Sequence, residues 1–313
     1  MKEAQETMES AQRKHKRNIR ALEECNEETT KVMDDLGKLE LEVLKSFERF
    51  SDVIEKIQNR PEFKEYRKDG VRLPKYNKQD LKEVSVGAGV LLGGLGGAAV
   101  GTAGGFAAAG ATTSAVMALG TASTGTAIAS LSGAAATNAT LAALGGGAIA
   151  AGGGGIALGT TVLGAATLGV GLLVGGVIFN ATGSKLSEQA DEAYAQMRKA
   201  ARQMNEIKEY LIELQNTASD YMTSIKQVRE KYMKYLNFIS YVVEDYGKTD
   251  WNQFTQDEKM VTQNMVLLVG LLYKMCQVNL VKKSNNEKDM NTINKDAVYQ
   301  SIENADRVLG EVA

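Results

Sequence analysis

Apolar residues recur in a seven-residue pattern near the N-terminus. From about residue 3 to Gln58, apolar and small side chains alternate gaps of three and four residues, with charged residues between them. This spacing places them along one side of an α-helix, and the packing of such stripes produces a coiled coil. The pattern predicts a helix of roughly 80 Å at 1.5 Å per residue. Its clearest seam positions are Leu22, Leu36, Val43 and Phe50.

A second stretch, from Leu186 to Val242, keeps the same alternation without a slip. It predicts a second long helix packed on another helix, with seam positions that include Met204, Leu211 and Ile225. Gly247 follows as a stop signal. We expect the two long helices to pair antiparallel.

Two further helices are predicted near the C-terminus. Thr255 and Glu258 form the sequence signature of a capping box, which starts a helix that runs to about Val281. Its apolar stretch 265–275 contains a lysine and is short for a bilayer crossing, so it predicts a buried bundle helix. A polar loop then leads to a last short helix near residues 296–309.

The middle of the chain has a different composition. The 101 residues between Glu83 and Lys185 contain no Asp, Glu, Lys, Arg or His, but hold 27 of the 32 glycines. Two apolar runs, 84–107 and 156–179, are each long enough to cross a bilayer. The intervening part, 108–155, is richer in Ser, Thr and Ala.

Glycines in this segment recur at a spacing of four, which places them on one face of a helix. Each costs roughly 1 kcal/mol relative to alanine in a helix in water, but a row of them lets a second backbone approach closely in lipid. The positions that we assign to helix packing and membrane insertion are Gly89, Gly93, Gly97, Gly101, Gly105, Gly125, Gly133, Gly147, Gly155, Gly171 and Gly175.

Several interpretations of the glycine-rich segment compete. A nucleotide-binding loop is disfavoured because no Gly-Lys-Ser/Thr sequence occurs and no acidic residue follows within the segment. A flexible linker does not explain the frequent Val, Leu and Ile, and a collagen repeat requires proline. A tightly packed, water-soluble Ala/Gly hairpin stored against the charged helices stays open, and it is also a resting form of a membrane-inserting segment. Antiparallel flanks would bring the ends of the segment together, so the segment would cross a membrane twice or four times.

Composition narrows the function further. The formal net charge of -2 gives no reason to expect nucleic acid as a partner. The two cysteines form no disulfide framework, and the polar N-terminus is not that of a secretory signal peptide. The only histidine, His15, lies with Asn18 in the helix seam, where a polar layer that sets helix register is the simplest interpretation. We expect no catalytic residues, no metal, no cofactor and no enzymatic activity.

The predicted fold is all-α: an elongated antiparallel helical bundle or coiled coil that carries a long Gly/Ala-rich hydrophobic helical hairpin. We divide it into an N-terminal heptad helix, a polar connector, an uncharged glycine-zipper membrane-insertion segment, a second long heptad helix and C-terminal bundle helices. The corresponding ranges are 1–60, 61–83, 84–184, 185–247 and 248–313.

This layout resembles the α-helical pore-forming toxins of the cytolysin A and haemolysin BL type. The resemblance rests on the heptads and on 84–184, an insert that is longer and richer in glycine than the apolar tongue of those toxins. Residues 122–155 also look like a small-residue module of uncharacterised bacterial proteins, and a little like the Gly/Ala cores of interferon-inducible membrane proteins and of apolipoprotein L. These likenesses imply membrane association rather than a reaction.

The expected function is therefore that of a membrane-inserting, oligomerising pore-forming protein, a toxin or defence effector that stores a hydrophobic hairpin on a helical bundle. Its partners would be a lipid bilayer, further copies of itself and, in a multi-part toxin, a second protein component. It would be soluble, either cytoplasmic or released without a signal peptide, before becoming membrane-bound. The alternative is a constitutive integral membrane scaffold or sensor with a cytoplasmic coiled-coil stalk.

Overall fold

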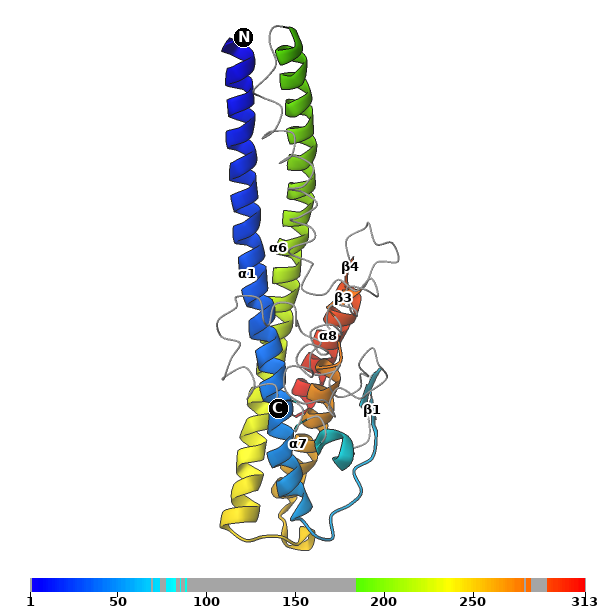
Figure 1. The fold of residues 1–313 in the computed structure, drawn as a ribbon. Helices are drawn as coiled ribbons and strands as arrows, with labels where there is room; N and C mark the ends of the chain where they lie inside the picture. Colours follow the sequence, from blue (N-terminus) through cyan, green and yellow to red (C-terminus); the bar gives the residue numbers. More distant parts are fainter. Residues whose placement is uncertain are drawn as a thin grey trace.

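The fold is that of a computed structural model, which describes residues 2–68, 70–73, 77–82, 85, 88, 184–278, 280–282 and 292–312. These residues are mostly helical. The helices are α1 (Lys2–Glu55), α6 (Ser184–Ser240), α7 (Gln256–Met275) and α8 (Lys295–Glu311). The two longest, of 54 and 57 residues, lie side by side and make a rod (Figure 1).

The two long helices run parallel, and the expected antiparallel pairing is wrong. Contacting residues keep a nearly constant offset along both helices: Gln215 donates to Thr29, Arg229 pairs with Glu42, and Lys56 pairs with Glu244. In an antiparallel pair the sum of the residue numbers would be constant instead. A short loop enforces antiparallel neighbours. Here 128 residues separate Glu55 from Ser184, and so long a connection can run back to the end of the rod at which α1 begins.

The parallel register gives a direct cross-linking prediction. The Arg49 guanidinium donates to Asn237 at 3.1 Å, and both side chains are exposed. Because the two long side chains meet only at their tips, we expect Arg49→Cys combined with Asn237→Cys to be joined within one chain by a reducible bismaleimide linker rather than by a direct disulfide. As a matched control, Arg49→Cys with Asp191→Cys would join only in an antiparallel pair. Gel mobility before and after reduction measures both, and cross-linking of the control pair alone would contradict the parallel arrangement.

The lower part of the rod is a four-helix bundle. Here α7 returns alongside α6, while α8 runs in the same direction as α6, as the constant offset of Asp220–Tyr299 and Tyr221–Ser301 shows (Figure 1). We call this the four-helix half; on the long helices it begins at Leu36 and Leu214, the first members of its continuous apolar core. The largest fully buried side chains include Phe47, Phe50, Tyr221 and Tyr232.

The upper part of the rod contains α1 and α6 alone among the described elements (Figure 1). We call it the two-helix half. Its buried apolar cluster consists of Leu22, Cys25, Met204 and Leu211. The seven seam residues named from the sequence are all buried: three lie in this cluster, and the rest lie in the core of the four-helix half, namely Leu36, Val43, Phe50 and Ile225.

Residues 241–255 connect α6 to α7. After a π-helical turn, η4 (Tyr241–Asp245), Gly247 adopts a positive φ of 69°, a conformation that glycine reaches without strain. The predicted capping box is confirmed, because the Thr255 hydroxyl accepts from the backbone N–H of Glu258 while the Glu258 carboxylate accepts from the backbone of Thr255. The predicted buried bundle helix is also confirmed, with six apolar residues of the stretch 265–275 in the core.

Two short hairpins were not predicted. β1 (Tyr66–Lys68) pairs antiparallel with β2 (Val71–Leu73), and β3 (Val281–Lys282) pairs with β4 (Thr292–Ile293). The first hairpin turns between Lys68 and Val71, where Gly70 has a φ of 81° and is preceded in the sequence by an aspartate. An Asp-Gly pair between two β-forming stretches is the usual signature of such a turn.

Candidate functional site

The glycine positions assigned to helix packing, from Gly89 to Gly175, lie outside the described residues, as does most of the segment 84–184. Among the described residues, no helix combines the length and the apolar character that a bilayer crossing requires. What the structure does place is the point at which the uncharged segment leaves the bundle and the point at which it returns. These two junctions form the candidate site.

The entry junction is packed against the bundle. Residues 78–82 are helical, as are Ser85 and Ala88. Leu81, Ser85 and Ala88 are 5%, 1% and 0% exposed, and the two apolar residues belong to the core of the four-helix half. Their spacing of four and three residues places them on one helical face. The first residues of the uncharged segment are therefore part of the folded core.

Polar contacts fix the same junction. The Ser85 hydroxyl donates to the carbonyl oxygen of Lys45 at 2.8 Å and accepts from the backbone N–H of Glu48 at 3.2 Å. Lys78 forms an ion pair with Glu55 near the end of α1. Burial, and then the nearby Asp80 carboxylate, raises the pKa of Tyr273 on α7. The entry junction is thus bonded to α1, and its Asp80 carboxylate lies near Tyr273 of α7.

The return junction lies at the opposite end of the rod. Ser85 is bonded beside Ser46, whose hydroxyl is 3.3 Å from that of Tyr232. Ser184 precedes Tyr232 by 48 residues of continuous helix, which is about 70 Å at 1.5 Å per residue. This separation is more than twice the ~30 Å hydrocarbon thickness of a bilayer.

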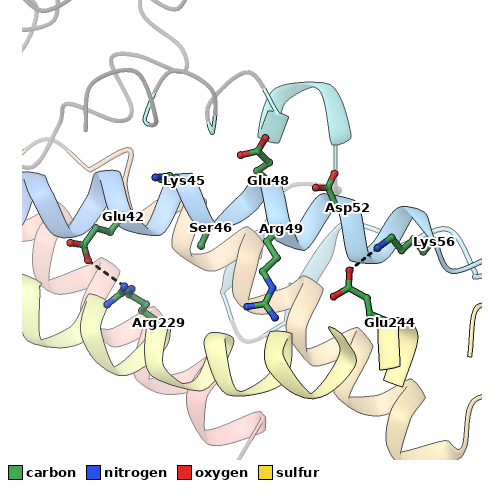
Figure 2. A pocket seen from close by; sticks show the side chains of 9 residues that line it. All are labelled: Glu42, Lys45, Ser46, Glu48, Arg49, Asp52, Lys56, Arg229 and Glu244. Carbon is green, nitrogen blue, oxygen red and sulfur yellow. Dashed lines mark hydrogen bonds and ion pairs between the residues drawn. The ribbon is translucent and has the colours of Figure 1, made fainter. Parts of the chain in front are cut away.

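A groove of about 710 Å³ runs along the seam between α1 and α6 near the entry junction (Figure 2). Five of its eight charged side chains have partners: Glu42 pairs with Arg229, Lys56 pairs with Glu244, and Arg49 donates to Asn237. Glu48 and Asp52 point away from α6, toward the ribbon of residues 78–82 (Figure 2). Four acidic and four basic side chains line the groove, so its net charge favours neither anions nor cations.

A second cavity, of about 410 Å³, lies between the connector, α7 and the end of α8. Phe63, Val266 and Leu267 give it an apolar wall, and the amide side chains of Gln263 and Asn264 face the same space. Its rim is closed by Tyr66, whose hydroxyl donates to Glu311 at 2.6 Å. This hydrogen bond joins the connector to the end of α8, as expected for a gap between packed elements.

The buried polar groups pin helices together. The Tyr221 hydroxyl donates to the carbonyl oxygen of Met275 at 2.6 Å and lies 3.2 Å from the Ser301 hydroxyl, so it ties α6 to the end of α7 and to α8. Burial raises the pKa of Tyr221 well above its ordinary value, which keeps the hydroxyl protonated. Cys25 and Cys276 are both buried, and neither is in a disulfide.

His15 lies half-buried in the two-helix half, where burial lowers its pKa and favours the neutral imidazole. Its position fits the predicted polar layer. Among the residues that the structure describes, no three His, Cys, Asp or Glu side chains gather closely enough to hold a metal ion.

Sequence reasoning missed the docking of the entry junction. Ser85 and Ala88 fall inside the run 84–107, which was interpreted as one membrane-crossing stretch. The available signal was the 4–3 spacing of Leu81, Ser85 and Ala88, which continues a helical stripe from the connector into the uncharged segment.

No family model, curated protein or solved structure matches this chain. The features that bear on function are the composition of the uncharged segment and the geometry of its two junctions.

Proposed function

We propose that this chain is a membrane-inserting, oligomerising pore-forming protein whose helical rod carries the uncharged segment until it meets a bilayer. One observation carries the proposal. A charged rod is interrupted by 101 residues without a single charged side chain, a composition that suits lipid and has no evident use in a rod surrounded by water.

The two apolar runs at the ends of this segment support two crossings. Residues 84–107 and 156–179 each reach the ~20 residues that a transmembrane helix needs, and within lipid a helix satisfies all of its own backbone hydrogen bonds. The glycine faces would let the inserted helices of one or several copies approach closely. Insertion of 108–155 as well would make four crossings. The finer fold proposal is thus a rod with a Gly/Ala-rich helical hairpin.

The positions of the two junctions restrict how the uncharged segment can enter a bilayer. Because the entry and the return are held about 70 Å apart along the rod, the segment cannot enter one patch of bilayer as a closed hairpin while both junctions keep their places. We infer that one junction must leave its resting position during insertion. The rod would then act as a store that separates the two ends of the segment.

The test is dye release from phosphatidylcholine liposomes. Simple deletion of 84–184 is an unsuitable control, because it would join two points about 70 Å apart. The matched control replaces residues 89–183 with a Gly/Ser linker of the same length, which keeps Ser85, Ala88 and Ser184 and reaches that distance as a flexible coil. We expect the natural chain to release dye at least about tenfold faster than the linker variant, with similar helical circular dichroism of the rod.

The outcomes separate the candidate functions. Release by the natural chain alone would support a pore-forming protein. Equal release by both chains, or none by either, would contradict it. If the natural chain is instead found only in membranes from synthesis onward, with no soluble pool, the constitutive membrane scaffold or sensor becomes the better proposal.

A further inference from the structure

We propose that Leu81, Ser85 and Ala88 form a latch that holds the start of the uncharged segment on the four-helix half, and that release of Ser85 from α1 limits the rate of insertion. This inference rests on the proposed function. It concerns the control of insertion rather than insertion itself.

The apolar part of the latch is the face formed by Leu81 and Ala88. Both side chains are buried and belong to the same core as Phe47 and Phe50. Leu81 precedes the uncharged segment, whereas Ala88 lies inside it, so the latch spans the boundary between the polar connector and the uncharged segment. Pulling the segment toward lipid therefore exposes apolar surface from the bundle first.

The hydrogen bonds in the polar part of the latch can be broken without leaving a buried polar group unpaired. While docked, the Ser85 hydroxyl bonds to the backbone of α1 at Lys45 and Glu48. After release, a serine hydroxyl within a helix can bond to the carbonyl oxygen three or four residues earlier in its own helix. Release therefore exchanges one set of hydrogen bonds for another and leaves no buried polar group unpaired. A contact of this kind can hold the segment at rest and still open.

We expect release of the latch to be the slow step, because the entry junction is attached to the larger core. The return junction at Ser184 belongs to the two-helix half, whose buried apolar cluster is far smaller than the core of the four-helix half. The entry junction is attached to the large core of the four-helix half and is tied at its start by the pair between Lys78 and Glu55. Local opening costs least where few apolar contacts are lost, so the return junction should open more readily than the entry junction.

The decisive variant is Ser85→Glu in the full chain. A carboxylate at this buried position cannot donate to the Lys45 carbonyl and has no room to stay hydrated, so it should undock the latch. Lys82→Gln is the matched control, because it makes the same change in net charge at an exposed position of the same helical stretch. Ser85→Ala removes the hydroxyl and keeps the small size, which provides a milder variant.

We expect three results with phosphatidylcholine liposomes. Ser85→Glu should release dye at least about fivefold faster than the natural chain, Ser85→Ala should fall between them, and Lys82→Gln should leave the rate unchanged. Without liposomes, amide hydrogen exchange of residues 77–88 should quicken in Ser85→Glu and not in Lys82→Gln. A bismaleimide linker between Glu48→Cys and Lys82→Cys should slow release at least about tenfold.

Other results would overturn the latch. Faster exchange in Ser85→Glu without faster release would mean that docking does not limit insertion, and unchanged exchange would mean that Ser85 does not hold the segment. Both results are distinguishable from failure of the proposed function, in which the natural chain releases no more dye than the Gly/Ser linker variant. If Ser85→Glu loses the helical signal of the rod, the comparison of Ser85→Ala with Lys82→Gln decides.

Discussion

Replacing Phe50 with alanine is expected to lower the free energy of unfolding of the four-helix half by about 3–5 kcal/mol. The Phe50 ring is fully buried and lies 6.5 Å from the ring of Tyr232, in a core that α1, α6, α7 and α8 share. Removing it leaves a cavity that rigid helices on several sides cannot close. Urea denaturation followed by the fluorescence of Trp251, the only tryptophan, measures the effect in this half of the molecule.

Leu22→Ala provides the matched comparison. Leu22 is just as well buried, with 2% of its surface exposed, but it lies in the two-helix half. If the two halves unfold separately, its loss should shift the Trp251 transition by less than about 1 kcal/mol, because that transition does not include the upper rod. Equal shifts for the two variants would show that the rod unfolds as one cooperative unit.

The elements that rest on local patterns were predictable from the sequence. Heptad spacing identified both long helices and placed residues such as Leu36 and Ile225 on a face that is buried. The capping box at Thr255 and the stop at Gly247 follow from short-range chemistry, because the hydrogen bonds and backbone angles involved are set within three or four residues.

The direction of α1 relative to α6 was not predictable in this way. A stripe of apolar residues specifies that a helix has a partner, but the same stripe fits a parallel or an antiparallel neighbour. The choice depends on the connection, and here the connection is long enough to allow both. The mistaken antiparallel prediction came from applying the rule for short loops to a 128-residue connection.

A second stripe of buried residues on α1 also indicates the four-helix half, and it was not used in the prediction. Glu40, Leu44, Phe47, Ser51 and Ile54 repeat the 4–3 spacing on an arc next to the main seam of α1, and all five are buried. A second stripe means that the helix has neighbours on two sides.

The candidate site was predicted in part. Composition identified the uncharged segment and its boundaries, since the absence of charge over 101 residues needs no structural knowledge. The docking of Ser85 was not predicted. The 4–3 spacing marks a helical face but not its partner, because the hydrogen bonds to the backbone at Lys45 and Glu48 depend on tertiary packing. The role of the glycine faces stays a prediction.

Amide hydrogen exchange is expected to differ by at least about 100-fold between the two halves of α1, which corresponds to about 3 kcal/mol in local opening free energy. Residues 36–54 should be the more protected, because they face a core built from four helices. Residues 6–25 should exchange faster, because among the described elements they pack only against α6. Mass spectrometry of peptides from the full chain at pH 7 measures both ranges together.

This gradient connects the stability of the rod to its proposed action. The return junction at Ser184 would lie in the half that opens readily, and the entry junction at Ser85 would lie in the half that does not. Adding phosphatidylcholine liposomes should then raise exchange first in 6–25 and the first turns of α6, and only later in 77–88, as the latch releases. Similar protection along the whole of α1, or earlier loss of protection at 77–88, would contradict this order and would place the mobile end of the uncharged segment at its entry.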